Sequence, residues 1–203
     1  CYNEQEALPL FYEAASRQMA ALPGYDFELL FVDDGSRDCT LSLLKAYAEK
    51  DARVRYLSFS RNFGKESAMY AGLVNASGDY VAFMDADLQD DVEIIEDFMD
   101  KYLEGYEVVY GVRSDRKSDT FFKRATAQGY YKFMKKLGVD LVFNHADCRL
   151  MGSRALEAMS HYRETNLFLR GIVPSIGFKS TNIYYERAER FAGESKYPLK
   201  KML

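Results

Sequence analysis

The sequence predicts an α/β fold with a mostly parallel central sheet flanked by helices. Short apolar runs that end in polar or acidic residues alternate with amphipathic segments of helical periodicity, four times between residues 7 and 113. The runs are apolar almost throughout, as in strands that are buried on both faces of a parallel sheet. Ligands of such sheets bind outside the carboxyl ends of the strands, so the residues directly after each strand are the first candidates for a functional site.

Turn signals separate the expected elements. The first helix stops at Pro23-Gly24 and the third at Ser77-Gly78, because proline and glycine end helices. After Arg113 the pattern changes, and a charged loop at 114–119 leads into a long helical stretch. The expected helices cover residues 7–22, 40–50, 65–75, 92–104, 120–137, 153–162 and 165–173, and the expected strands cover 27–34, 54–60, 80–87, 107–113, 146–151 and 180–190.

Length and composition narrow the function classes. A chain of 203 residues favours one domain, and 27 Lys and Arg against 31 Asp and Glu leave a net charge of −4, so nucleic acid is not an expected partner. The three cysteines are far apart, which disfavours a disulfide framework or a zinc site and suits a reducing compartment. No apolar run approaches the roughly 18 residues of a membrane-spanning helix.

Two predicted strands end in paired acids, and the second pair indicates a metal site. In a strand that continues to residue 87, Asp85 and Asp87 point to the same face. Two carboxylates held so close repel each other unless a cation lies between them, which suits Mg²⁺ or Mn²⁺ with oxygen ligands. Gln89 would add a further oxygen. The alternative is that these acids cap the helix that begins near Val92, because acids favour helix N-termini.

The first pair is Asp33-Asp34, which is followed by Gly35-Ser36. The functional interpretation is that Asp34 accepts hydrogen bonds from a base or ribose, and the alternative is ordinary turn chemistry. In a doubly wound sheet the two acid pairs would meet in one crevice, so each supports the other. The sequence has no GxGxxG after the first strand, and no GxxxxGK[ST] or GxSxG motif. A nucleotide would therefore be held through a metal and strand-tip acids.

Six segments carry a resemblance to a known family: in chain order, they are CYNEQEAL, FVDDGSRDCT, SRNFGKESAMYAGLVNASGDYVAFMDADLQD, VVYGVRSDR, ADCRLM and RAERFAGESKYPLKKM. The chain resembles family 2 glycosyltransferases of the polyprenyl-phosphate type, which includes bactoprenol glucosyltransferases and dolichyl-phosphate mannosyltransferases. The resemblance covers essentially the whole chain. It implies one GT-A catalytic domain over 1–203, with a nucleotide-sugar-binding half at 1–113 and an acceptor-binding half at 114–203. It also implies an N-terminal strand and C-terminal membrane helices outside this chain.

The resemblance further assigns roles to residues on the donor side. It implies that Mg²⁺ or Mn²⁺ is held by Asp85, Asp87 and Gln89. The residues that it places on the nucleotide sugar are Tyr2, Glu4, Asp34, Arg61, Lys65, Asp85 and Ala86. Without the family, Arg61 and Lys65 are explained equally well as part of a solvated loop that precedes a helix.

On the acceptor side, Asp147 stands where the family places an acid that faces the sugar and the acceptor, and it is the candidate catalytic residue. Its role as a base or as an orienting group stays open, because a polyprenyl phosphate is already anionic and needs little general-base help. The alternative for Asp147 is a strand-end carboxylate paired with Arg149. The candidate cations for the acceptor phosphate are Arg113, Arg187, Arg190 and Lys196, with a solvated charged face as the alternative. Attraction to anionic lipid headgroups is equally expected for Arg116, Lys117 and Lys123.

With these residues in place, the resemblance implies a metal-dependent, inverting hexosyltransferase at the cytoplasmic face of the cell membrane. It would move glucose from UDP-glucose to a polyprenyl (undecaprenyl) phosphate for cell-envelope glycan modification, with GDP-mannose second and UDP-N-acetylhexosamine third as donor. A nucleotidyltransferase is disfavoured because its Gly-x-Gly-Thr-Arg loop is absent, while a non-catalytic nucleotide-sugar-binding domain stays open. We also expect self-association into a homo-oligomer, and weak order of the 114–119 loop before substrate binds.

Overall fold

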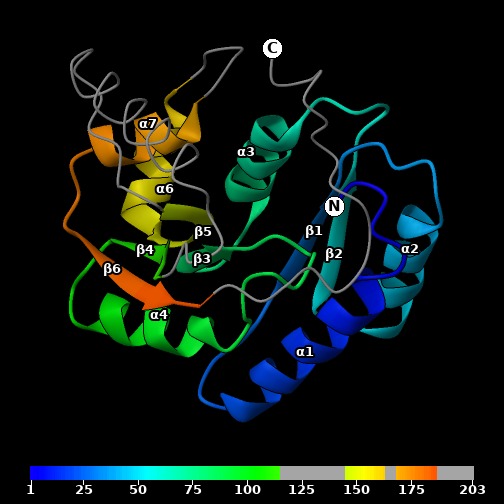
Figure 1. Cartoon of the computed structure of the whole chain (residues 1–203), viewed down its shortest axis with the longest axis horizontal. Coiled ribbons are helices and arrows are strands. Elements are labelled where there is room, and N and C mark those ends of the chain that lie inside the picture. The colour runs from blue at the N-terminus through cyan, green and yellow to red at the C-terminus, as the bar shows by residue number, and fades with distance from the viewer. Residues whose placement is uncertain (115–144, 163–167, 187–203) are drawn as a thin grey trace, which may run out of the picture.

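The computed structural model describes residues 1–114, 145–162 and 168–186, and these form two sheets covered by helices (Figure 1). The smaller sheet pairs β1 (Leu29–Asp33) with β2 (Val54–Ser58) in parallel. The larger sheet has the order β3-β5-β4-β6. Its strands are β3 (Tyr80–Phe83), β4 (Val108–Arg113), β5 (His145–Gly152) and β6 (Ser180–Tyr185).

The larger sheet is mixed. β4 pairs in parallel with β6, whereas β5 lies between β3 and β4 and is antiparallel to both. β3, β4 and β6 therefore share one direction. The insertion of β5 brings the residues at its start beside the carboxyl end of β3, so Phe83 pairs with Arg149 although 66 positions separate them in the chain.

Helices cover both sheets, and each buries one apolar face. α1 (Leu8–Ala21) shows the pattern: its buried residues Leu8, Phe11, Ala15 and Met19 recur every three or four positions and form one stripe. Pro9 is tolerated in its first turn, where the backbone N–H has no partner within the helix. The other helices are α2 (Thr40–Lys50), α3 (Lys65–Asn75), α4 (Ile94–Leu103), α6 (Ser153–Ser160) and α7 (Leu169–Ser175).

The alternation of strand side chains divides the core between the two faces of the larger sheet. On one face, Val108 and Val112 of β4 pack with buried residues of α3, α6 and α7. On the other face, Val109 and Leu150 pack with Phe98 of α4. A third cluster joins α1 and α2 to the smaller sheet.

The α/β class and the elements of the first half are confirmed, with one correction that concerns the site. The strand predicted over 80–87 ends at Phe83, so Asp85 and Asp87 lie in an irregular turn and not on one face of a pleat. Leu88 in this turn has a left-handed backbone with φ of 56°, which a continuing strand does not allow. The late strand expected over 180–190 ends at Tyr185. The expected helix at 120–137 lies outside the described residues, as does the 114–119 loop apart from Ser114.

The central position of β5 predicts a large effect of truncating its core side chain. Leu150 is fully buried, so Leu150→Ala should lower the free energy of unfolding by about 2–5 kcal/mol through lost burial and the cavity left behind. Urea denaturation followed by circular dichroism measures this change. The control is Leu103→Ala on α4, where the side chain is 68% exposed, and its effect should stay within about 0.5 kcal/mol. Equal effects of the two substitutions would contradict the assignment of β5 to the core.

Candidate active site

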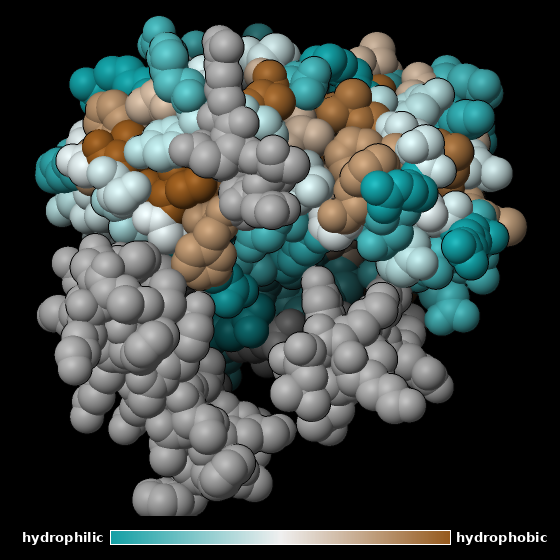
Figure 2. Space-filling model, turned by 90° about the horizontal axis from the view of Figure 1, so that it is seen from above, coloured by the Kyte–Doolittle hydropathy of each residue, from teal (hydrophilic) through white to brown (hydrophobic). Residues whose placement is uncertain are grey.

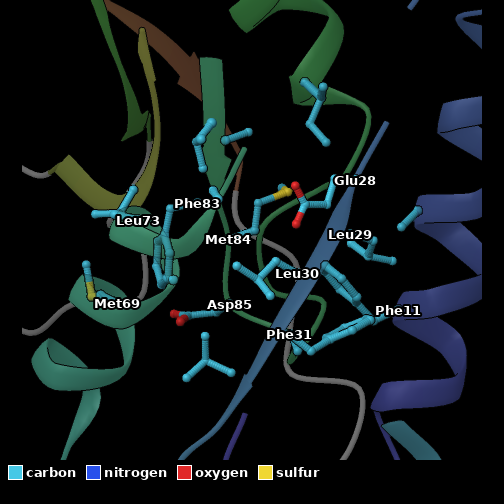
Figure 3. Close-up of a pocket in the computed structure, with 18 of the residues that line it drawn as sticks. Phe11, Glu28, Leu29, Leu30, Phe31, Met69, Leu73, Phe83, Met84 and Asp85 are labelled. Atoms are coloured by element: carbon cyan, nitrogen blue, oxygen red, sulfur yellow. The ribbon is translucent and has the colours of Figure 1, made fainter. Parts of the chain in front are cut away.

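A cavity of about 1030 Å³ lies between β1 and β3, and its polar end collects the predicted donor-side residues. The close-up in Figure 3 shows Leu30 of β1, Leu73 of α3 and Phe83 of β3 around it, with Asp85 at its border. Seen from above, hydrophilic residues predominate where the described surface is visible near the middle of the molecule (Figure 2). The predicted residues that line the cavity are Tyr2, Glu4, Asp34, Lys65, Asp85, Ala86 and Asp87.

The first residues of the chain are held in place along the turn after β1. The backbone N–H of Asn3 donates to Ser36 Oγ at 2.9 Å, and that of Glu4 donates to Thr40 Oγ1 at 2.8 Å. In return, the side-chain oxygen of Asn3 accepts from the Arg37 N–H at 2.8 Å. These bonds position Tyr2 and Glu4 at the cavity although neither belongs to a helix or strand.

Asp34 links the end of β1 to the loop that precedes α3. Its Oδ1 accepts from the Phe63 N–H at 2.7 Å, and its Oδ2 accepts from the Gly64 N–H at 3.0 Å. Gly35 allows the loop to approach: its φ is +68°, and a Cβ there would lie 2.4 Å from the Arg61 carbonyl carbon. Asp34 therefore sets the position of this loop, a role the sequence did not reveal, and its contact with a nucleoside stays a prediction.

The two cations of this loop have different environments. Arg61 is exposed and lies over the ring of Phe63, 4.1 Å from its centroid. Lys65, the first residue of α3, places its Nζ 2.7 Å from Asp85 Oδ2 and 2.6 Å from Asp147 Oδ2. Burial lowers the pKa of Lys65, but the two carboxylates outweigh burial and hold this pKa above its ordinary value. Lys65 is therefore a charged bridge between the carboxyl end of β3 and β5.

Asp147 is buried among cations. Besides Lys65, its carboxylate accepts from Arg170 Nε at 2.8 Å, and Arg149 lies 3.7 Å away. Burial raises the pKa of Asp147, but the Arg170 hydrogen bond and the Lys65 charge outweigh burial, so this pKa lies well below its ordinary value. The expected pairing with Arg149 is present but is the longest of the three contacts.

Arg170 and Arg149 complete this cluster. Arg170 comes from α7, far along the chain, and no motif in the sequence pointed to it. Arg149 was considered only as a partner of Asp147, and its side chain is fully buried. Its Nε donates to the Asp147 carbonyl at 3.1 Å, while its two terminal nitrogens have no hydrogen-bond partner among the described residues. Burial lowers the pKa of Arg149.

The turn with Asp85, Asp87 and Gln89 offers oxygen donors for a metal. Asp87 is buried at the cavity, and its Oδ1 accepts from the Gln89 N–H at 3.2 Å. Within residues 1–114, 145–162 and 168–186, no group of three or more His, Cys, Asp or Glu residues is placed to hold a metal ion. Two carboxylates and an amide oxygen are nonetheless the hard donors that Mg²⁺ and Mn²⁺ prefer, and substrate phosphates commonly complete such sites. These residues are thus of the chemical type that the predicted metal binds, and their assignment as its ligands stays a prediction.

Of the predicted acceptor-side cations, Arg113 is the one that the structure describes. It ends β4, and its terminal nitrogen lies 3.8 Å from the buried Asp90, which also accepts from the Tyr185 hydroxyl at 2.5 Å. Arg113 thus has a protein counter-charge. Outside the described residues lie Arg187, Arg190, Lys196, Arg116, Lys117 and Lys123. No helix among the described residues is long and apolar enough to span a bilayer.

Comparison with known proteins places this chain in a family. The uncharacterized glycosyltransferase YkoT of Bacillus subtilis (strain 168) is 50% identical over 214 residues, covering 100% of this chain and 62% of its own. The bactoprenol glucosyl transferase of Shigella phage SfV is 43% identical over 197 residues, covering 97% of this chain and 64% of its own. The chain therefore spans less than two thirds of the length of these relatives.

A solved structure supports the fold. Glucosyl-3-phosphoglycerate synthase from Mycobacterium tuberculosis, in complex with Mn²⁺, UDP-glucose and phosphoglyceric acid, superposes with a TM-score of 0.58. It is 19% identical, and the match covers 100% of this chain and 72% of that one, so the likeness shows the GT-A fold alone. The model of the Glycosyl transferase family 2 matches residues 1–159. With its fold, its strand-tip acids and these relatives, the chain belongs to glycosyl transferase family 2.

Proposed function

We propose that this chain is the catalytic domain of an inverting glycosyltransferase that transfers glucose from UDP-glucose to a polyprenyl phosphate at the cytoplasmic face of a membrane. The observation that carries the proposal is the convergence of Asp34, Lys65, Asp85 and Asp87 on one cavity. The name of the phage relative, bactoprenol glucosyl transferase, supports glucose as the transferred sugar and a polyprenyl phosphate as the acceptor.

The donor binds at the polar end of the cavity in this proposal. The nucleoside would contact the residues on the side of β1, which are Tyr2, Glu4 and Asp34. The diphosphate would lie near Asp85 and Asp87, on the side of β3. Asp85, Asp87 and Gln89 would hold Mg²⁺ or Mn²⁺ together with diphosphate oxygens. When bound, the ion supplies positive charge that stabilises the departing nucleoside diphosphate.

Lys65 adds a protein cation beside the metal ligands. Its ammonium group is shared between Asp85 and Asp147, and a raised pKa keeps it charged at neutral pH. An ammonium held in a partly buried site stabilises phosphate charge more strongly than one in water, because the local dielectric constant is lower. Lys65 is therefore suited to contact the diphosphate or the transferred sugar.

Asp147 is better suited to positioning than to proton abstraction. A carboxylate whose pKa lies far below its ordinary value is a weak base, and a polyprenyl phosphate needs little general-base help. Asp147 instead holds Lys65 and Arg170 on two sides of one carboxylate. We infer that this arrangement orients two cations toward the reacting phosphates.

The acceptor phosphate needs cations on the side opposite the departing diphosphate. Arg113, at the carboxyl end of β4, is the candidate within the described residues, and Arg170 is a second one that the geometry adds. Arg187, Arg190 and Lys196 stay candidates from the sequence. Proximity to a membrane follows from the acceptor, since the lipid chain of a polyprenyl phosphate stays in the bilayer.

The donor-site assignment predicts that Asp87→Ala abolishes most of the activity of the full-length enzyme. Without this carboxylate the metal and diphosphate lose a ligand, so transfer from UDP-glucose to undecaprenyl phosphate in the presence of Mn²⁺ should fall by about 100-fold or more, equivalent to about 2.7 kcal/mol or more of transition-state stabilisation. Radiolabelled glucose in the lipid fraction measures the transfer. The control is Asp91→Ala, an exposed acid of the same segment, which should keep activity.

Calorimetric titration with nucleotides and Mn²⁺ tests the nucleotide of the donor and the metal-binding role of Asp87 separately. Wild type should bind UDP more tightly than GDP, and Asp87→Ala should weaken metal-dependent UDP binding. Tighter binding of GDP would replace UDP-glucose by GDP-mannose as the donor. Unchanged transfer in Asp87→Ala would refute the metal assignment. Nucleotide binding without transfer to any polyprenyl phosphate would favour a non-catalytic domain.

The ion pairs of Asp147 with Lys65 and Arg170 predict that Asp147→Asn lowers the free energy of unfolding by an amount that depends on pH. The pKa of Asp147 is lower in the folded chain than the roughly 3.9 of an unfolded Asp, so its stabilising contribution is present above about pH 4 and is lost as the pH falls further toward the folded-state pKa. Asp147→Asn should therefore lower the free energy of unfolding by about 3 kcal/mol at pH 7, and the difference from wild type should shrink as the pH falls below about 4.

Denaturant unfolding at a series of pH values measures this difference. The matched control is Asp100→Asn on α4, an exposed acid whose substitution should have little effect at any pH. A cost of Asp147→Asn that does not change with pH would show that the carboxylate charge does not hold the cluster together.

A further inference from the structure

Arg149 is a buried cation that the proposed function does not use. Its side chain is 1% exposed. On β5 it pairs in register with Phe83 of β3 and Tyr110 of β4, so its cross-strand neighbours are both aromatic. Burial lowers the pKa of Arg149, but a guanidinium group stays charged in proteins. A buried charge is costly unless it is paired and hydrogen-bonded, so the partner of Arg149 needs to be identified.

Asp147 is the acid beside this guanidinium group. The two residues are two positions apart on β5, so their side chains point to the same face of the sheet. Arg149 Nε donates to the Asp147 carbonyl oxygen at 3.1 Å, which fixes the guanidinium group next to this residue. Arg149 Nη2 lies 3.7 Å from Asp147 Oδ1, close enough for an ion pair but too far for a hydrogen bond. Neither Nη1 nor Nη2 has a hydrogen-bond partner among the described residues.

Lys65 and Arg170 make the short contacts with the carboxylate that Arg149 does not make. Lys65 Nζ lies 2.6 Å from Asp147 Oδ2, and Arg170 Nε donates to Oδ1 at 2.8 Å. The side chains of Lys65 and Arg170 are 32% and 40% exposed, so each can also reach a ligand from solvent, whereas Arg149 cannot. Asp147 is therefore contacted by two accessible cations and by a third that is shielded from solvent.

We propose that Arg149 is a positioning residue that holds the Asp147 carboxylate when Lys65 turns to the diphosphate of the donor. The inference rests on the proposed function, which places Lys65 at the diphosphate or the transferred sugar. When Lys65 leaves, Asp147 Oδ2 loses its partner, and the carboxylate turns to the two terminal nitrogens of Arg149. The planar guanidinium group matches the two oxygens of a carboxylate, so this pair forms with little loss of side-chain freedom.

This exchange of partners lowers the cost of releasing Lys65. An ammonium group that leaves a buried carboxylate without a counter-charge meets a large electrostatic penalty. A second cation that is already in place removes most of this penalty, because Asp147 stays charged and paired. Arg170 keeps its bond to the same carboxylate and thus its position. Arg149 therefore strengthens donor binding although it does not touch the donor.

Glu66 provides the competing explanation. Its charge also acts on Arg149, after that of Asp147. Glu66 Oε2, however, accepts from the backbone N–H of Leu169 at 3.1 Å, at the start of α7. In the competing explanation, Arg149 only balances the charges of Asp147 and Glu66 inside the core, and its role does not change when a ligand binds.

A cycle of substitutions at Arg149 and Lys65 in the full-length enzyme separates the two explanations. Calorimetry with UDP and Mn²⁺ measures the dissociation constant. Arg149→Met should raise this constant by about 10-fold, because Lys65 then stays with Asp147. In a Lys65→Met background the same substitution should change it by less than about 2-fold, because no ammonium group is left to be released. Arg149→Lys keeps a cation at this place, and its constant should stay within about 3-fold of wild type.

Thermal unfolding of the four proteins of the cycle without nucleotide gives a second, independent measure. With Lys65 present, Arg149→Met should shift the melting temperature by less than about 2 °C, because the terminal nitrogens of Arg149 have no hydrogen bond to lose among the described residues. In the Lys65→Met background it should lower the melting temperature by about 4 °C or more, because Asp147 then depends on Arg149.

An equal rise of the dissociation constant in both backgrounds would overturn the proposal and leave Arg149 with a structural role. An unchanged constant for Arg149→Met with Lys65 present would also overturn it. If wild type binds no nucleotide, the proposed function fails, and the melting temperatures alone decide whether Arg149 takes over Asp147. Equal shifts in the two backgrounds would then refute this exchange of partners, and a larger shift in the Lys65→Met background would support it.

Discussion

The candidate site depends on the sharing of one ammonium group by two carboxylates that come from different strands. Asp85 comes after β3 and Asp147 belongs to β5, and Lys65 Nζ lies within 2.7 Å of an oxygen of each. Two such acids would repel each other without the cation. The bridge also ties the first turn of α3 to the larger sheet. The segment 61–65 is therefore held by the ion pairs of Lys65 and by the hydrogen bonds that Asp34 accepts from Phe63 and Gly64.

The antiparallel insertion of β5 explains how this bridge forms. A strand that simply continued the parallel order would place its carboxyl end, and not its start, beside the end of β3. Because β5 runs the other way, Asp147 near its beginning comes next to Asp85, and Arg149 pairs in register with Phe83. β5 therefore contributes to both the site and the core, because Asp147 lies at the site and Leu150 is buried against α4.

Sequence reasoning located the elements of the first half and the strand-tip acids Asp34, Asp85 and Asp87 because these depend on local signals. Tyr2, Glu4 and Lys65, which also line the cavity, came from the resemblance, and the roles of all these residues toward a donor stay predictions. Apolar runs, turn residues and acids at strand ends identify each strand and the turn after it. The direction of β5 depends on pairing between distant strands, which no local pattern encodes. The turn at Asp85–Asp87 was mistaken for strand because its apolar and acidic letters alternate, whereas the backbone turns at Leu88. Arg170 was missed because its partner lies 23 positions away and no spacing rule relates a helix residue to a strand carboxylate.

The cavity between β1 and β3 has a polar end and an apolar part, and this difference limits where a charged ligand can bind. At the end near Asp34, Asp85 and Asp87, charged side chains face the space, and in the proposed function a metal ion compensates the charge between these carboxylates and a nucleoside diphosphate. Along the strands, the walls are mainly apolar side chains, among them Leu30 of β1, Leu73 of α3 and Phe83 of β3, which offer a charged ligand no counter-charge. The polar end is therefore the part of the cavity suited to the proposed donor, and Cys1 lies beside it, held by its hydrogen bond to the Val32 carbonyl.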